Sequence, residues 1–149
     1  MDTSERTPLD TVLDLALART LVLRHVDMPL GSHHGVSLSD LALLLELRGA
    51  PGEKLRRVDL ASRLGITPSG VARQLAPLER IGLVGRESNP RDARLALVIL
   101  TESGRRVADE ARVTADEAAE GALSAIWPAA ERLELAKLLQ AVGRSNSSL

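Results

Sequence analysis

The 149-residue chain contains no cysteine. Disulfide bonds, thiolate metal sites and redox sensing by cysteine are therefore excluded within it. Aromatic residues are almost absent too, with one Trp, no Tyr and no Phe. Stacking of nucleic-acid bases on aromatic rings is consequently nearly unavailable. The apolar residues are mostly Leu, Val and Ala, which favours a core of packed helices.

Long apolar runs are also missing, and none approaches the roughly 20 residues that a membrane-spanning helix needs. The N-terminal MDTSERTPLD is acidic and lacks the apolar segment of a signal peptide. We therefore expect a soluble cytoplasmic protein with no membrane partner. Hydrophobic residues make up 44% and charged residues 26%, an ordinary globular composition. The length predicts a single domain over residues 1–149.

Charge is distributed unevenly although the formal net charge is only −1. Residues 54–106 hold eleven Lys or Arg and five Asp or Glu, a balance of +6. The rest of the chain holds eight basic and fifteen acidic residues, a balance of −7. A basic middle between acidic ends is the asymmetry expected of a local nucleic-acid footprint, although a charge-balanced solvated surface is the alternative.

Apolar spacing, capping residues and breakers predict a mainly helical chain with one β-hairpin. The predicted helices cover residues 9–27, 38–47, 58–64, 68–81, 101–126 and 129–142, and the predicted strands cover 83–87 and 95–100. Pro29, Gly31 and Gly35 are expected to end the first helix, and RGAPGEK is expected to be a loop. Leucines occupy most of the surface of residues 38–47, which predicts a buried central helix.

Two short helices joined by a tight turn and followed by a hairpin form the pattern of a winged helix-turn-helix. Gly65 is expected to end the first of these helices. Thr67 and Pro68 give a strong start signal for the second, whose free N–H groups would favour a phosphate. Arg and Gln side chains suit contacts with guanine and adenine in the major groove. The candidate major-groove residues are Thr67, Ser69, Gly70, Arg73 and Gln74.

The hairpin turn contains the basic segment NPRDAR, residues 89–94. Asn89 and Pro90 would stiffen the turn, and Arg91 and Arg94 could enter a neighbouring minor groove. Asp92 is unsuited to DNA and is expected to pair with Arg86 or Arg94. The alternative is an exposed turn whose ion pairs contribute under about 1 kcal/mol.

Residues 57–104 resemble the core of the MarR family of bacterial winged-helix transcription regulators. The resemblance rests on RVDLASRLGITPSGVARQLAPLERIGLVGRESNPRDARLALVILTESG. The matching positions are Leu60-Ala61, Leu64-Gly65, Ser69, Val71, Arg73, Leu78-Glu79, Gly82-Leu83-Val84, Arg86, Asp92, Arg94, Leu100-Thr101 and Gly104. Ala93 departs from the arginine that the family often carries there, and Pro77 is expected to bend the recognition helix.

The resemblance implies a fold in which a winged helix-turn-helix, residues 36–106, is flanked by dimerisation helices over 9–27 and 107–144. It implies a homodimer that binds a palindromic operator in double-stranded DNA, more often as a repressor. It places Arg94 in the minor groove, with Asp92 and Arg86 steadying the wing. It also implies a small phenolic or otherwise lipophilic effector, whose pocket residues the motif does not specify.

Other functions find less support in the residues. His25, His33 and His34 raise the possibility of a metal site, but adjacent histidines near glycine more often face solvent. Acidic residues do not cluster, and no glycine-rich phosphate loop or nucleophile motif occurs, so we expect neither an enzyme nor a cofactor. The competing hypothesis is a winged-helix module that binds protein partners and does not bind DNA specifically.

Overall fold

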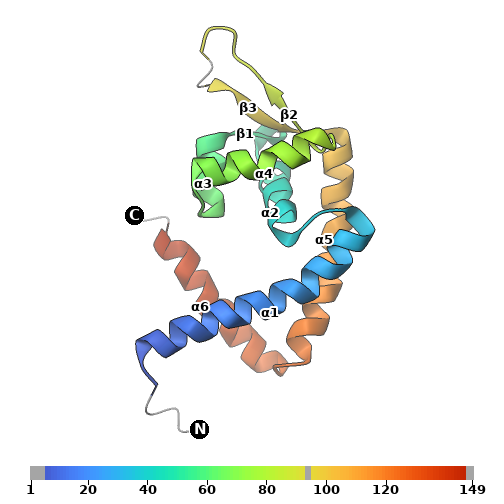
Figure 1. The fold of residues 1–149 in the computed structure, drawn as a ribbon. Coiled ribbons are helices and arrows are strands. Elements are labelled where there is room, and N and C mark those ends of the chain that lie inside the picture. Colours follow the sequence, from blue (N-terminus) through green and yellow to red (C-terminus); the bar gives the residue numbers. More distant parts are fainter. Residues whose placement is uncertain (1–5, 93–94, 147–149) are drawn as a thin grey trace.

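The computed structural model describes residues 6–92 and 95–146, with the backbone alone from 144 to 146. Figure 1 shows a winged lobe at one end of the molecule and two helical arms at the other. The elements in chain order are α1 (Pro8–His34), α2 (Leu38–Gly49), the 3-10 turn η2 (Pro51–Glu53), β1 (Lys54–Arg56), α3 (Arg57–Leu64), α4 (Pro68–Arg80), β2 (Val84–Glu87), β3 (Leu97–Leu100), α5 (Glu102–Ser124) and α6 (Ala129–Asn146). The predicted fold class, mainly helical with a small β wing, is confirmed.

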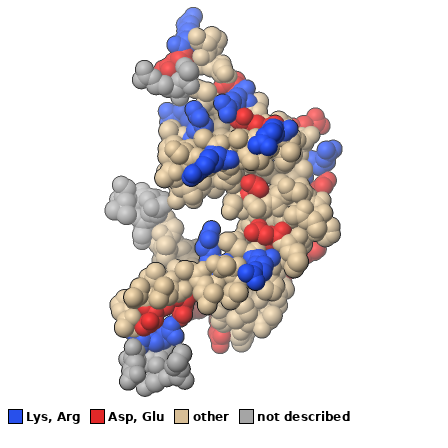
Figure 2. All heavy atoms as spheres, viewed as in Figure 1, with Lys and Arg blue, Asp and Glu red and all other residues tan. Residues whose placement is uncertain are grey.

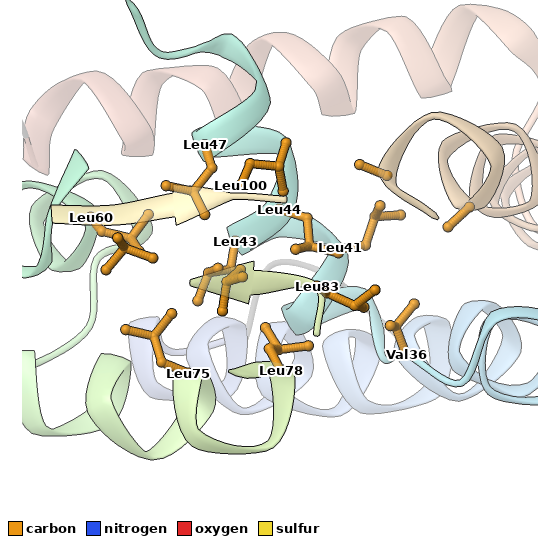
Figure 3. Close-up of a cluster of buried hydrophobic side chains, with 14 of the residues drawn as sticks. Val36, Leu41, Leu43, Leu44, Leu47, Leu60, Leu75, Leu78, Leu83 and Leu100 are labelled. Atoms are coloured by element: carbon orange, nitrogen blue, oxygen red, sulfur yellow. The ribbon is translucent and has the colours of Figure 1, made fainter. Parts of the chain in front are cut away.

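Helix α2 forms the centre of the winged lobe. Its side chains Leu41, Leu43, Leu44 and Leu47 are at most 1% exposed. Figure 3 shows these leucines in one cluster with Leu60 of α3, Leu75 and Leu78 of α4 and Leu100 of β3. The leucine-rich sequence thus predicted correctly which helix is buried, because a helix that is apolar on most of its surface needs neighbours on most sides.

Local capping signals determine where most helices begin and end. Ser37 caps α2, and its side chain accepts from the Asp40 backbone N–H at 3.1 Å. Thr67 caps α4 in the same way, and Gly65 ends α3 in the left-handed conformation with φ of 64°. These caps follow the rules by which a side-chain oxygen or a glycine satisfies helix ends.

The first helix is longer than the sequence predicts. We expected a helix over residues 9–27, whereas α1 continues through Pro29 and Gly31 and ends at Gly35, which is left-handed with φ of 67°. Val26 and Leu30, 2% and 0% exposed, belong to the core on this last part of α1. Burial of a large apolar side chain contributes about 1.5–3 kcal/mol, which offsets the hydrogen bond that Pro29 removes.

The sheet contains a strand that the sequence analysis missed. The predicted loop RGAPGEK ends at Lys54, and no element is predicted for residues 55 and 56, but residues 54–56 form β1 and pair antiparallel with β3, with Leu55 opposite Val98. The strand order is β1-β3-β2, so β3 is central. A three-residue strand has too little periodicity to be recognised alone, and it exists here because β3 supplies its hydrogen-bonding partner.

The arms leave a large apolar surface uncovered. Figure 1 shows α1 crossing α5 and extending away from the winged lobe, with α6 on the same side. Exposed apolar residues on these arms are Leu9, Val12, Leu13, Leu15, Leu17 and Leu21 of α1 and Leu133, Leu138, Leu139 and Val142 of α6. Within the described ranges, no helix has the combination of length and apolar character that crossing a bilayer requires.

Candidate nucleic-acid interface

The exposed start of α4 is the first part of the candidate interface. Thr67 Oγ1 accepts the Gly70 backbone N–H at 3.1 Å, and Pro68 occupies the first turn. Residues 67–69 are exposed, so the remaining N–H groups at this helix start face solvent. A helix N-terminus of this kind attracts phosphate through its unpaired N–H groups and its dipole.

Burial of one face of α4 determines which side chains point outward. Val71, Leu75 and Leu78 are 0%, 1% and 2% exposed and attach this face to the core. Ser69 and Arg73 lie on the opposite, exposed surface, while Gly70 is half-buried. The predicted contacts Thr67, Ser69 and Arg73 therefore share one accessible surface.

Gln74 differs from the other predicted major-groove residues. It is half-buried, and its Nε2 donates a long hydrogen bond of 3.5 Å to Asp40 Oδ1. The other oxygen of Asp40 accepts the Ser37 backbone N–H at 3.0 Å in the capping box of α2. The Gln74 side chain thus points toward α2 and connects the recognition helix with the start of that helix.

The wing is a short two-stranded extension with a structured turn. Asn89 Oδ1 accepts the Arg91 backbone N–H at 2.9 Å, and the Asp92 backbone N–H donates to the Asn89 carbonyl at 3.3 Å. Arg91 is exposed on this turn. The predicted minor-groove residue Arg94, like Ala93, lies outside the described residues.

Arg86 has a different partner from one of those predicted. Of the two partners predicted for Asp92, Arg86 is wrong, because Arg86 Nε donates to Glu79 Oε1 of α4 at 2.7 Å. The other predicted partner, Arg94, lies outside the described residues. This hydrogen bond, with the attraction of the carboxylate, raises the pKa of Arg86 above its ordinary value. Glu79 lies near the end of the recognition helix α4, so this hydrogen bond joins the wing to that helix.

Figure 2 shows several Lys and Arg side chains over the winged lobe on this face. Among the described residues, the guanidinium groups of Arg57, Arg73, Arg80 and Arg91 form no hydrogen bond or ion pair. Arg80 ends α4, which continues through Pro77 to that residue. Unpaired cations gathered on one lobe are the footprint expected for a polyanion.

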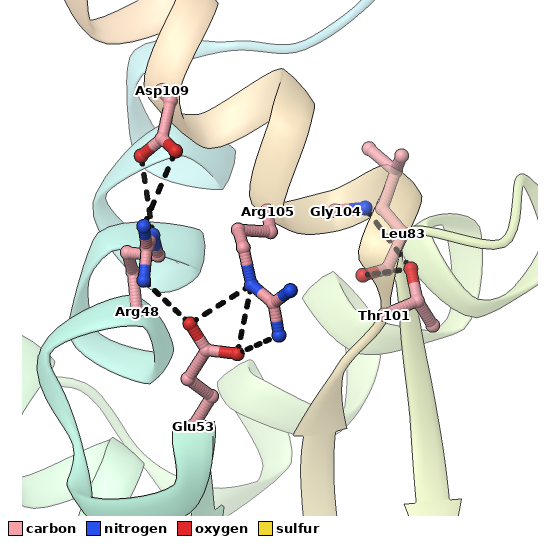
Figure 4. Close-up of polar contacts among 7 residues, drawn as sticks. All are labelled: Arg48, Glu53, Leu83, Thr101, Gly104, Arg105 and Asp109. Atoms are coloured by element: carbon pink, nitrogen blue, oxygen red, sulfur yellow. Dashed lines mark hydrogen bonds and ion pairs between the residues drawn. The ribbon is translucent and has the colours of Figure 1, made fainter.

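An ion network connects this lobe with α5 and was not anticipated from the sequence. Glu53 accepts from Arg48 Nη1 at 2.6 Å and from Arg105 Nε at 3.0 Å, and Arg48 Nε donates to Asp109 at 3.2 Å (Figure 4). Hydrogen bonding from Arg105 lowers the pKa of Glu53, although partial burial opposes the change. The sequence carries no signal for the network because its members come from α2, η2 and α5.

A second junction brings the start of α5 against the loop before β2. Thr101 Oγ1 donates to the Gly82 carbonyl at 2.6 Å, and it accepts the Gly104 N–H at 3.0 Å. Figure 4 shows Gly104 beside the Leu83 carbonyl. A Cβ at position 104 would stand 2.0 Å from that oxygen, so only glycine fits. The wing and α5 therefore meet without an intervening side chain.

Two of the three histidines lie within hydrogen-bonding distance of other groups of the protein. His34 Nε2 and Thr114 Oγ1 are 2.8 Å apart, which joins the end of α1 to α5. His25 Nδ1 lies 2.9 Å from the Leu21 carbonyl of its own helix. In the part of the chain that the structure describes, no three His, Asp or Glu side chains are grouped in a way that could hold a metal ion.

Comparison with known proteins indicates independently which family this chain resembles. A MarR family model matches residues 34–95, which include α2, α3, α4 and β2. A curated relative, the uncharacterized HTH-type transcriptional regulator YdgJ of Bacillus subtilis, is 39% identical over 71 residues. That match covers 48% of this chain and 42% of the relative.

Solved structures match over most of the chain. A MarR family regulator from Streptomyces coelicolor, in complex with DNA, has a TM-score of 0.79 at 27% identity, covering 94% of this chain and 89% of its own. CouR from Rhodococcus jostii RHA1, bound to p-coumaroyl-CoA, has a TM-score of 0.73 at 28% identity, covering 90% of this chain and 92% of its own.

Proposed function

Because the chain belongs to the MarR family of transcriptional regulators, we propose that it is a cytoplasmic repressor that binds double-stranded DNA sequence-specifically. One observation carries this proposal. The exposed start of α4, the unpaired Arg73 on the same surface of that helix and the exposed Arg91 of the wing turn all belong to the winged lobe (Figure 1). Residues 36–106 are the proposed DNA-binding lobe, with Ser69 and Arg73 in the major groove and Arg91 and Arg94 at the minor groove.

A homodimer would explain the exposed leucines of the arms. Leu13 is 58% exposed and Leu138 is 61% exposed, although both belong to the apolar faces of their helices. Extended apolar patches on soluble proteins mark interaction surfaces. A second copy would cover α1 and the 107–144 segment, and it would present two recognition helices to a palindrome with half-sites about 34 Å apart.

Modulation by a small ligand is the further part of the proposal. The regulator from Rhodococcus jostii is bound to p-coumaroyl-CoA, which shows that a protein of this fold accommodates an organic ligand. In the present chain, α1 lines an open hollow of about 520 Å³. The hollow is lined by Arg19, Thr20, Leu23, Arg24, Asp27 and Met28, so it offers apolar groups and charges of both signs to a ligand.

Selection of bound duplexes from a random library, at near-physiological salt, tests the DNA proposal. The expected result is an enriched palindrome whose half-sites are about one helical turn apart. Weak retention that disappears with salt and shows no enriched sequence would instead favour the protein-interaction module. The excess of arginine on residues 54–106 argues against that module, because binding a protein partner does not require unpaired cations on the wing.

A further inference from the structure

A small hollow lies at the root of the wing, apart from the recognition surface and the wing turn. It has a volume of about 20 Å³ and is lined by Arg57, Arg86 and residues 96–98 of β3. Arg57 is the first residue of α3, and Arg86 lies on β2. A volume of this size accommodates one oxygen atom, since a water needs about 10–15 Å³.

The two arginines keep donors available to a ligand in this hollow. Arg57 is exposed and has no hydrogen bond or ion pair among the described residues. Arg86 uses its Nε for Glu79, which leaves its terminal amino groups free to donate elsewhere, because a guanidinium carries five N–H donors. The hollow therefore offers guanidinium donors from two different elements.

Acidic groups near the hollow already have their own cations. Glu79 is neutralised by Arg86 at 2.7 Å, and Asp59 of α3 accepts two hydrogen bonds from Arg56, at 2.8 and 3.1 Å. Glu87 pairs with Lys54 at 3.3 Å. Residue alternation along β2 directs the Glu87 side chain to the face opposite Arg86. The unpaired positive charge at this place is therefore that of Arg57.

The geometry of duplex DNA determines what would face this hollow. A recognition helix in the major groove and a wing in the adjacent minor groove lie on either side of one phosphodiester backbone. The hollow lies between these two elements, because Arg86 connects β2 with Glu79 of α4 and Arg57 faces the same stretch of β3. A surface in this position faces phosphates and no base edges.

We propose that Arg57 binds the backbone phosphate that separates the two grooves, in the hollow whose other wall is Arg86. This inference rests on the proposed DNA-binding function and adds a contact that none of the recognised motif positions supplies. A phosphate oxygen fits the hollow, and a guanidinium donates to phosphate in a forked, charge-assisted geometry. The contact is independent of base sequence, so it contributes equally to specific and to random DNA.

The test measures the affinity of the full-length chain for a labelled duplex by fluorescence anisotropy between about 50 and 200 mM KCl. Two probes are used, namely the duplex enriched by selection and a random duplex of the same length. The variant is Arg57→Ala. The matched control is Arg112→Ala on α5, which removes the same charge from another exposed arginine without a described partner. Arg57→Lys retains the charge, and circular dichroism verifies that each variant is folded.

Each lost phosphate contact lowers the salt slope by about 0.9, and a dimer with one such contact per protomer loses about twice that. Over the stated range, wild type should therefore lose about 12-fold more affinity than Arg57→Ala, on both probes. Arg112→Ala should match wild type, and Arg57→Lys should retain most of the slope.

An Arg57→Ala slope equal to those of wild type and Arg112→Ala would overturn the assignment while leaving DNA binding intact. A loss confined to the selected duplex would also overturn it, because Arg57 would then contact a base. Wild type that binds neither probe with a salt-dependent affinity would overturn the proposed function, and the phosphate contact with it.

Discussion

Replacement of Gly104 by alanine should strongly destabilise the junction between the wing and α5. A Cβ on this residue would stand 2.0 Å from the Leu83 carbonyl oxygen and 2.8 Å from Leu100 Cδ1. The Leu83 oxygen cannot simply move aside, because it accepts from the Thr101 backbone N–H at 3.2 Å and also lies 3.0 Å from the Thr101 hydroxyl, which donates over the shorter distance of 2.6 Å to the Gly82 carbonyl. Relief of the clash therefore requires the backbone before β2 to separate from α5.

The size of the effect follows from three contributions. Overpacking against backbone costs about 3 kcal/mol, the upper end of the usual range. Weakening one hydrogen bond to Leu83 adds about 1 kcal/mol. The better helix propensity of alanine offsets about 1 kcal/mol. The free energy of unfolding should therefore fall by about 3 kcal/mol, which for a chain of this length lowers Tm by about 6–12 °C.

Urea and thermal unfolding of Gly104→Ala, at one protein concentration because the proposed dimer would be linked to stability, measure this loss. The matched control is Gly121→Ala in the same helix, where a Cβ would meet nothing within 4 Å. That control should be stabilised by roughly 1 kcal/mol, because only the propensity contribution remains. Equal stability changes in the two variants, or a Gly104→Ala protein as stable as wild type, would refute the argument from close approach.

Three further predictions concern the recognition helix, the ion network and the arms. Arg73→Ala should cost about 1–3 kcal/mol of binding and relax base choice at one position per half-site, whereas Gln74→Ala, which removes a bond to Asp40, should leave base choice unchanged. Duplex selection with each variant distinguishes them, and relaxed choice in Gln74→Ala would contradict the structure. Because the pKa of Glu53 is lowered in the fold, its contribution to stability is present above the unfolded value of about 4.3 and is lost as the pH falls through the folded pKa. The stability difference between wild type and Glu53→Gln, measured by urea unfolding, should therefore shrink below about pH 4, and a pH-independent difference would argue against the network. Leu138→Glu should shift sedimentation toward monomer while Gln140→Glu should not, and two unchanged dimers would exclude this part of α6 from the interface.

The candidate interface shows which residue assignments the motif predicts and which require the tertiary structure. The helix start signal identified Thr67, and the motif identified Ser69 and Arg73; all three are exposed at or near the start of α4. It could not show that Gln74 points toward α2, because its partner Asp40 lies 34 residues earlier in the chain. Likewise, the motif does not single out Arg57, because the hollow beside it is formed with β3, which follows by about 40 residues.

The local features of this protein follow from residues that are close together in the sequence. Caps such as Thr67 and Thr101, the left-handed Gly65 and the leucine-rich α2 depend on neighbours within about one helical turn, so spacing alone predicts them. Features that need distant partners depend instead on how the elements pack in the folded chain. Core packing carries α1 through Pro29, β3 turns residues 54–56 into a strand, and Glu79 rather than Asp92 pairs with Arg86. In each case the free energy comes from burial or pairing with a segment remote in the chain, which local propensity does not contain.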